Sequence, residues 1–482
     1  MTRINTNIAS FQAINRLGAS NRDLSVHLER LSTGLKINSA SDGPAALIAS
    51  ETLRSEIAGI GAAIDNSERA DSVIATAEGA LNEVNALLVD IKGLITNSAN
   101  EGAIANEEIK ANQLQIDSAV DSISRIANTT VFEGVKLLNG SLGFTTSGVA
   151  ASAVTDIRID EVRFGTASTV NVTIDPSVAA ERAELQWAGS AVTTATTIEV
   201  AGAKGVEVFS FAASATRSAI VSAINLAKDV TGVSAITGAA VVSTGAGVSG
   251  IVFNSIEYGS KQFVSVEARS GTFDTKRDTH TVVARRDTGV DISAAVNGVA
   301  AVADGLEIAV NGPSVWFTAT LHEDLNDPAE STSFTITGGG AKFQLGPAVN
   351  AQQMSILGIQ SVASHRLGNS TVGYLNQIKS DGVDSVIDKE FQDAGKIVDA
   401  AIQQVATMRG RLGAFQKNTL QTNINSLNVA LENVTASESA IRDADFATET
   451  SALTRSQILV QAGTSVLSIA NSQPQNVLAL LG

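Results

Sequence analysis

Apolar residues recur every three or four positions through two long stretches of the chain, one toward each end. The first stretch contains seven-residue series with further apolar residues between them: Leu17, Leu24, Leu28, Leu31 and Leu35, then Ile74, Leu81, Leu88 and Ile95, then Ile109, Ile116 and Ile123. This spacing is typical of helices that pack along coiled-coil seams. A continuous helix from Ala45 to about Asn97 would be roughly 80 Å long at about 1.5 Å per residue, so its apolar stripe needs a partner helix.

The second stretch repeats the pattern about 200 residues later. Its series are Phe391, Val398, Val405 and Leu412, then Leu420, Leu427, Val434 and Ile441, then Phe446, Leu453, Val460, Leu467 and Leu481. We therefore expect the chain to fold back on itself, with the two helical arms side by side.

The residues between the arms, about 144–347, follow a different pattern. Runs such as Val170–Ile174 and Val206–Phe211 alternate apolar and polar residues and are separated by Gly, Ser and Thr clusters, which predicts strands. Four of the six prolines also fall here, and proline is excluded from the interior of long helices. The sequence thus predicts an α+β fold, in which a long antiparallel coiled-coil-like helical bundle from both termini carries one or two inserted β-rich outer domains.

The apolar stripes continue almost to both ends of the chain. A single molecule has nothing else to cover them, so we expect the ends to become ordered by association with other copies. The candidate subunit-interface residues are Ile4, Ile8, Phe11, Ile14, Leu17, Leu24, Leu28, Leu31, Leu35, Phe446, Leu453, Val460, Leu467, Leu478 and Leu481.

Composition narrows the possible functions. The net charge of −16 argues against nucleic acid or an anionic membrane as a partner. The chain lacks cysteine, which excludes disulfides and thiolate metal sites. It has no apolar run of 18 residues and no signal-peptide pattern at its polar N-terminus, so we expect neither a membrane span nor export by a conventional cleaved signal.

Sequence features that would support catalysis are weak. Gly245 to Gly250 match G-x-G-x-x-G, but another strand-like run follows where a nucleotide site needs a helix. The four histidines are scattered and form no H-E-x-x-H motif, and spacing alone leaves a Ser-His-Asp triad open. We expect a tight β-turn at the glycines, no metal or cofactor, and no enzymatic role.

Several segments at the two ends resemble bacterial flagellins. They are Glu29–Ala40 (ERLSTGLKINSA), Ala45–Ala49, Ala77–Val84, Phe132–Leu138, Glu438–Thr450 (ESAIRDADFATET), Ser456–Ser465 and Pro474–Leu478. The resemblance covers about residues 1–143 and 340–482 and is nearly ungapped. It implies a structural subunit that polymerises into the flagellar filament for swimming motility, secreted to the extracellular flagellum.

The resemblance also implies a division of the chain. Residues 1–40 with 444–482 would form the inner filament tube as terminal helices. Residues 41–143 with 348–443 would form a helical core domain with a β-hairpin around Thr130 to Gly143, and 144–347 the variable outer region. The implied partners are further copies in a helical homopolymer, the flagellar cap, hook-filament junction proteins, an export chaperone and the flagellar export apparatus.

Two departures from the family pattern concern immune receptors. Flagellins that strongly activate the vertebrate Toll-like receptor carry arginine where this chain has Asp90 and an acidic residue where it has Gln115, while Leu94, close to Val89, is kept. We therefore expect weak activation. The stretch Arg30–Ala49 resembles the peptide read by plant receptors, but Ser41 and Gly43 depart from it.

Two other functions remain open at this point. A hook-filament junction protein shares the terminal helices, and a surface adhesin would use the β-rich middle to bind a ligand. The match at both ends favours the filament subunit.

Overall fold

The computed structural model describes residues 6–165, 167–189, 191–239, 249–277, 283–328 and 330–481. The chain divides into two compact units. Unit 1 contains residues 1–71, 344–353 and 416–482, and unit 2 contains residues 72–343 and 354–415. The division falls inside the 55-residue helix α2 (Pro44–Ser98). The boundaries of the units therefore differ from those of the three regions predicted from the sequence, and that three-region division remains a prediction.

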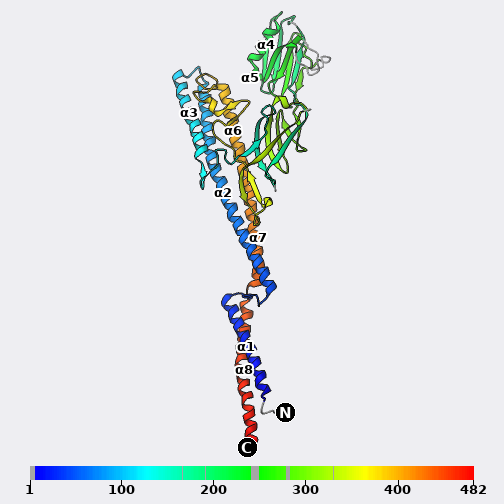
Figure 1. Ribbon diagram of the computed structural model, residues 1–482. Helices are drawn as coiled ribbons and strands as arrows, with labels where there is room; N and C mark the ends of the chain where they lie inside the picture. Colours follow the sequence, from blue (N-terminus) through cyan, green and yellow to red (C-terminus); the bar gives the residue numbers. More distant parts are fainter. Residues whose placement is uncertain are drawn as a thin grey trace. The chain divides into compact units, whose positions relative to one another are not determined.

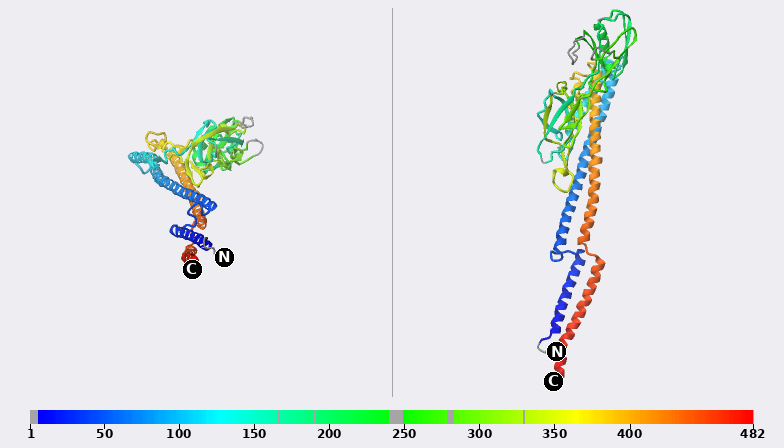
Figure 2. Two further views of the ribbon diagram at one scale, coloured as in Figure 1. Left: turned by 60° about the horizontal axis from the view of Figure 1, so that its bottom comes forward. Right: turned by 90° about the vertical axis from the view of Figure 1, so that its right-hand side faces the viewer.

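Unit 1 is helical. It contains α1 (Ile8–Thr33), the first half of α2, α7 (Thr422–Arg442) and α8 (Phe446–Leu481), and α8 continues through Pro474. Ile60 and Ala63 of α2 pack against Leu427 of α7, with Leu431 beside them. The α1 and α8 helices form a second pair (Figures 1 and 2).

The helical part of unit 2 combines the second half of α2 with α3 (Asn106–Thr129) and α6 (Phe391–Ala414). Most of their heptad residues are buried, and the fully buried ones include Leu81, Leu88, Ile116, Ile123, Val398 and Val405. The Arg409 guanidinium donates to the Glu78 carboxylate at 2.7 Å, and Lys92 pairs with Asp399. A two-stranded hairpin, β1 (Val131–Phe132) with β2 (Val135–Lys136), follows α3.

A π-helical segment, Phe415–Gln421, joins α6 to α7. The apolar series before this segment ends at Leu412 and the next begins at Leu420, eight residues later. The π turns interrupt the regular i to i−4 ladder here. The division between the units also falls at this segment, at Phe415.

The β-rich middle of unit 2 is confirmed and contains two separate cores. A sandwich encloses the first core with a five-stranded sheet, β14-β13-β5-β18-β3, and a six-stranded sheet, β15-β16-β17-β4-β20-β19. Its strands are β3 (Phe144–Ser147), β4 (Val154–Val162), β5 (Val170–Val178), β13 (Ser293–Val296), β14 (Val299–Ala300), β15 (Val302–Asp304), β16 (Glu307–Asn311), β17 (Val315–Leu321), β18 (Thr332–Gly339), β19 (Ala341–Gln344) and β20 (Met354–Leu357).

The second core is inserted between β5 and β13. It lies among two sheets, β6-β10-β9 and β12-β11-β7-β8, and the helix α4 (Arg217–Leu226), with Trp187 stacked on Phe273. The remaining elements are β6 (Glu184–Trp187), β7 (Thr196–Gly202), β8 (Val206–Phe211), α5 (Lys228–Thr231), β9 (Val233–Ala239), β10 (Ser249–Ser255), β11 (Phe263–Ser270) and β12 (Arg286–Thr288). Of the G-x-G-x-x-G motif, 245–248 lie outside the described residues, and Ser249 and Gly250 begin β10.

After β20 the chain returns to the helical part of unit 2. The short pair β21 (Gly368–Asn369) and β22 (Gly373–Tyr374) contacts α6. A 3-10 turn at Leu375–Ile378 directly follows β22. The Gln404 side chain of α6 accepts a hydrogen bond from the Gly368 amide at 3.0 Å. This segment therefore connects the β-sandwich to the helices.

Candidate assembly surface

The pair formed by α1 and α8 is antiparallel, as three contacts along its length show. Asn7 caps the start of α1 by accepting from the Ser10 amide, and its own amide group donates to the Ala470 carbonyl at 2.7 Å. The position of Gly463 lies against Leu17, and farther along α1 His27 bonds to Glu449. These contacts run in opposite directions along the two helices.

Six of the predicted heptad residues occupy the seam of this pair, whereas Leu28 and Phe446 are exposed. Leu17, Leu24 and Leu31 of α1 and Leu453, Val460 and Leu467 of α8 are all half-buried, beside the buried Ala13 and Ala470. These six side chains therefore contact the same chain. Whether they also contact a second subunit remains a prediction.

A charged contact lies near one end of the seam. The Glu449 carboxylate, about 8 % exposed, accepts from the His27 ring at 2.5 Å and from the Arg30 guanidinium at 3.1 Å. Burial raises the pKa of Glu449, but the hydrogen bonds from His27 and Arg30 outweigh it, so the pKa is lowered overall. The ionised carboxylate thus holds the two helices together.

Apolar side chains outside the seam are exposed. On α1 these are Ile8, Phe11, Ile14 and Leu28, which are 49 to 63 % exposed. On α8 they are Phe446, Ile458, Leu459, Val466 and Ile469. At about 3.6 residues per turn, Ile458, Leu459, Val466 and Ile469 fall within roughly a third of the circumference, facing away from the seam. The α8 helix is therefore apolar on two sides.

Four of these exposed residues are not among the interface candidates chosen from the sequence. Ile458, Leu459, Val466 and Ile469 lie off the seven-residue series that marks the seam. In the sequence these residues form a second apolar stripe at helical spacing on the opposite side of the helix, and that stripe would have identified them.

Leu35 lies past the end of α1. Gly34 ends the helix in a left-handed conformation, φ +75°, with its amide bonded to the Arg30 carbonyl at 2.8 Å. Leu35 then pairs with Asp443 in an isolated bridge, and the Lys36 amide donates to the Arg442 carbonyl at 2.7 Å. The expectation that the helical series extends through Leu35 was wrong, because glycine at this position stops the helix.

The other candidate residues are placed as follows. Ile4 lies outside the described residues, and Leu478 and Leu481 are in α8 with side chains outside them. In unit 2, Val89, Asp90 and Gln115 are exposed on α2 and α3, and Leu94 is half-buried. Receptor recognition through these four residues stays a prediction.

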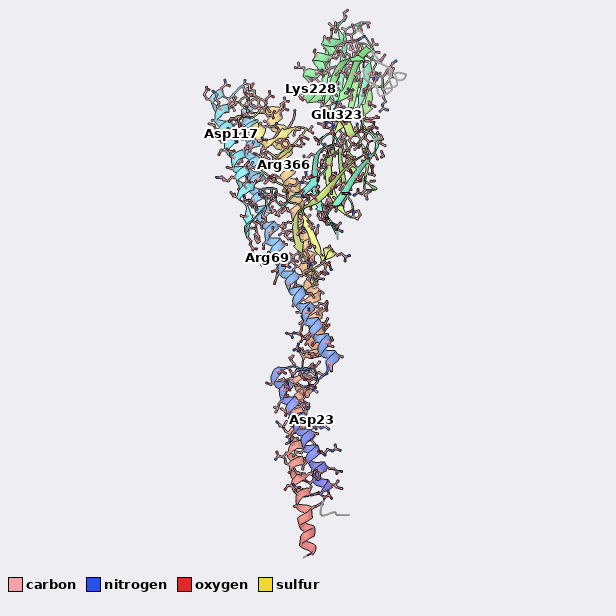
Figure 3. All side chains as sticks on the ribbon, viewed as in Figure 1. Asp23, Arg69, Asp117, Lys228, Glu323 and Arg366 are labelled. Carbon is pink, nitrogen blue, oxygen red and sulfur yellow. The ribbon has the colours of Figure 1, made fainter. Side chains whose placement is uncertain are left out.

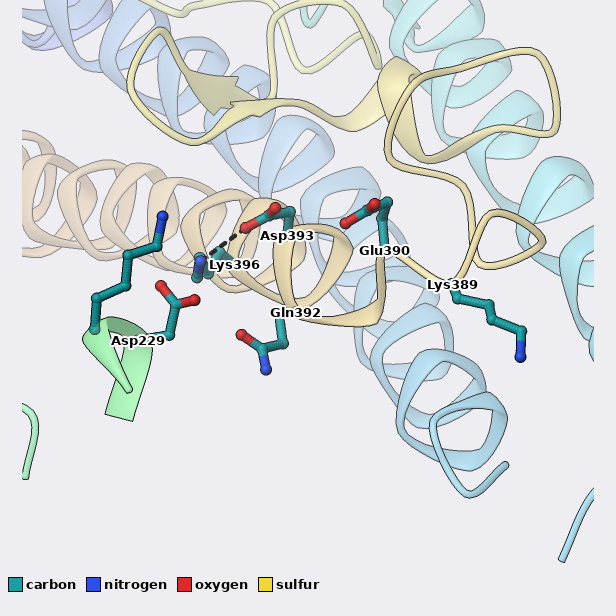
Figure 4. Close-up of a pocket in the computed structure, with 7 residues that line it drawn as sticks. Asp229, Lys389, Glu390, Gln392, Asp393 and Lys396 are labelled. Atoms are coloured by element: carbon teal, nitrogen blue, oxygen red, sulfur yellow. Dashed lines mark hydrogen bonds and ion pairs between the residues drawn. The ribbon is translucent and has the colours of Figure 1, made fainter. Parts of the chain in front are cut away.

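Pockets in the described residues offer little for catalysis. One in unit 2, of about 390 Å³, is lined almost entirely by charged side chains of both signs from α5 and the start of α6, and Lys396 pairs with Asp393 at 2.7 Å (Figure 4). No group of three or more His, Asp or Glu residues in the described ranges is arranged to hold a metal ion. None of the helices described combines the length and apolarity that a membrane crossing requires.

Comparisons with known proteins agree with the two helical arms. The family described as bacterial flagellin N-terminal helical region matches residues 4–142, and the bacterial flagellin C-terminal helical region matches residues 396–481. A B-type flagellin of Pseudomonas aeruginosa is 31% identical over 494 residues, covering 99% of both chains. A flagellin of Salmonella rubislaw is 29% identical over 508 residues, also covering 99% of each.

Among solved structures, the flagellar hook-associated protein 3 of Legionella pneumophila matches 80% of this chain and 97% of its own, at 14% identity and a TM-score of 0.30. That score is too low to support any argument. The full-length sequence relatives and the two matched helical regions decide the assignment: the chain belongs to the bacterial flagellin family, the structural proteins that polymerise into the flagellar filament.

Proposed function

We propose that this chain assembles into an extracellular helical homopolymer mainly through the exposed apolar faces of α1 and α8. The observation that carries the proposal is the second apolar stripe of α8, Ile458, Leu459, Val466 and Ile469, which no other part of the described chain covers. Burying one such side chain contributes about 1.5–3 kcal/mol. Several together can offset the cost of ordering and association.

The geometry of the pair favours an open assembly. The stripe on α8 and the stripe of Ile8, Phe11 and Ile14 on α1 are different surfaces, so a contact that joins one to the other is heterologous rather than self-complementary. Repeated head-to-tail contacts of this kind generate a helical polymer when the rotation does not close a ring.

The remaining parts of the proposal follow from family membership. Residues 1–40 with 444–482 line the filament interior, 41–143 with 348–443 surround them, and 144–347 face the solvent. The chain acts without catalysis, and its partners besides itself are the flagellar cap, hook-filament junction proteins, an export chaperone and the flagellar export apparatus. Asp90 and Gln115 make activation of the vertebrate receptor weak.

The test is seeded polymerisation followed by pelleting and electron microscopy. Ile458→Glu and Val466→Glu each place a charge on the second stripe of α8, and we expect both to abolish filament growth while the monomer keeps its thermal unfolding temperature. Leu226→Glu is the matched control, because Leu226 is 90 % exposed on α4 in unit 2, and it should polymerise normally.

A shortened chain, Ile37–Ile441, should stay folded and soluble without forming tubes. Normal filament growth by both glutamate variants would contradict the proposed surface. If the full-length chain stays monomeric with seeds present, the junction-protein or adhesin function replaces the filament subunit.

A further inference from the structure

A cavity of about 460 Å³ opens within unit 2 between the β-sandwich and the segment that follows β20. Its sandwich wall includes Asp156 and Arg158 of β4, and its opposite wall includes Gln360 and Arg366, the latter labelled in Figure 3. The volume falls in the range of small-molecule sites, roughly 300–1,000 Å³. Neither the heptad pattern nor the assembly surface accounts for it.

Main-chain hydrogen bonds hold the two walls together. β20 pairs with β4, and the Gly358 amide donates to the Asp160 carbonyl at 3.2 Å. The Ile359 amide then donates to the Leu142 carbonyl at 2.9 Å. The cavity is therefore a fixed feature of the fold.

A β-bulge interrupts β4 at Asp160. In the pairing with β17, Ile159 faces Phe317 and Glu161 faces Trp316, so Asp160 has no partner residue. Ile157 and Ile159 pack on the sandwich core, whereas Asp156 and Arg158 alternate to the other face of β4.

The bulge residue Asp160 is buried and pairs with Arg411 of α6 at 2.5 Å. Burial raises the pKa of Asp160, and Arg411 and Arg158 oppose that effect. Because Arg411 already pairs with this carboxylate, Asp160 does not act as a close partner of Arg158.

Two guanidinium groups that line the cavity, those of the half-buried Arg158 and the exposed Arg366, lack close partners. The nearest carboxylate to Arg158 is that of Asp156 at 3.8 Å, which is longer than a hydrogen bond. Arg366 makes no side-chain hydrogen bond or ion pair with the described residues. By contrast, Arg269 bonds to Glu199 at 2.7 Å.

The lining of this cavity carries a net positive charge. With histidine neutral, the two arginines and Asp156 leave one positive charge in the cavity, whereas the whole chain carries −16. The other polar residues that line it are Asn139, Thr146, Gln360, Ser361, His365 and Gln404, and the aromatic ones are Phe144 and Tyr374.

We propose that this cavity binds a saccharide that carries one carboxylate. A guanidinium matches a carboxylate with two parallel hydrogen bonds, and a single negative charge balances the excess positive charge. The amide and hydroxyl side chains of the lining supply donors and acceptors for sugar hydroxyls, and the two rings supply apolar surface. This role is independent of the polymerisation proposed above.

The test is calorimetric titration of the full-length protein with glucuronate, glucose and acetate. We expect saturable binding of one glucuronate per chain. Glucose, which lacks the carboxylate, and acetate, which lacks the sugar hydroxyls, should each bind at least about tenfold more weakly. Arg158→Gln and Arg366→Gln should each weaken glucuronate binding at least about tenfold.

Arg285→Gln is the matched control. Arg285 is exposed and also lies 3.8 Å from a carboxylate, that of Glu267, so the variant makes the same change in net charge away from the cavity and should bind glucuronate normally. All three variants should keep their unfolding temperature and polymerise on seeds, which separates this proposal from the assembly surface. Equal binding of acetate and glucuronate, or unchanged glucuronate binding in both cavity variants, would overturn it.

Discussion

Two helical seams in this protein have the same seven-residue spacing but different burial. In the helical part of unit 2, Leu81 and Leu88 of α2 are fully buried among three helices. In the α1–α8 pair of unit 1, Leu24 and Val460 are only half-buried. A two-helix pair cannot enclose its apolar residues, because each helix has only one neighbour to cover it.

The comparison shows what heptad spacing does and does not specify. It identifies the side of a helix that meets another helix, but the extent of burial depends on how many helices meet there. In the proposed assembly, the incomplete seam and the second stripe of α8 are the surfaces that we expect a further copy to bury.

The largest expected effect comes from substitutions that test this difference in burial. Leu88→Ala should lower the free energy of unfolding of the monomer by about 2–5 kcal/mol, because it removes a fully buried side chain and leaves a cavity. Leu24→Ala should lower it by roughly 1 kcal/mol or less, because the site is already partly hydrated.

Denaturant unfolding of the monomer measures both values. The same Leu24→Ala protein should polymerise more slowly on seeds than the wild type. Equal destabilisation by the two substitutions would show that the α1–α8 seam is already as closed in the monomer as the core of unit 2.

A second prediction concerns the charged contact of the α1–α8 pair. The pKa of Glu449 is lowered in the folded chain, so its contribution to stability is complete above the unfolded pKa of about 4.5 and is lost as pH falls through the folded pKa. Glu449→Gln should cost roughly 1.5 kcal/mol near neutral pH, the lower range for a hydrogen bond to a charged group.

Circular dichroism melting between about pH 7 and pH 3 checks this prediction. The difference between wild type and Glu449→Gln should shrink as the carboxylate of the wild type is protonated. Glu29→Gln, an exposed position on α1, serves as control and should follow the wild type throughout. A difference that stays constant with pH would mean that the charge of Glu449 is not what holds the helices.

Much of this fold could be predicted from the sequence, because the hydrophobic period is a local property. The helix from about Ala45 to Asn97 is α2, and the alternating runs Val170–Ile174 and Val206–Phe211 lie in β5 and β8. The end of α1 could also have been predicted, since a glycine after a helical series is a common helix stop.

The cavity residues could not be predicted in the same way. Arg158 and Arg366 are about 200 residues apart, and they meet only because β20 pairs with β4 and the segment after it bonds to α6. The bulge at Asp160 has no sequence signal of its own, since no glycine or proline marks it. A cavity of this kind depends on how distant elements pack together. The hydrophobic period of a helix can be read from neighbouring residues alone.

The smallest expected effect tests the helix end that separates α1 from α2. A Cβ added at Gly34 meets no atom within 4 Å, but φ is +75°, so Gly34→Ala should cost about 1 kcal/mol through backbone strain alone. Gly18 lies inside α1 and is also open. Gly18→Ala should therefore stabilise the helix by about 0.5–1 kcal/mol, since alanine loses less entropy there.

Both substitutions lie at or in α1, so hydrogen exchange of the α1 amides is the appropriate measurement. Protection from exchange should fall in Gly34→Ala and rise in Gly18→Ala. Gly34→Asn is the control that separates strain from volume, because asparagine tolerates the left-handed conformation better than alanine. It should lose less protection than Gly34→Ala although its side chain is larger. The opposite order would mean that space at the end of α1, and not the backbone angle, requires glycine.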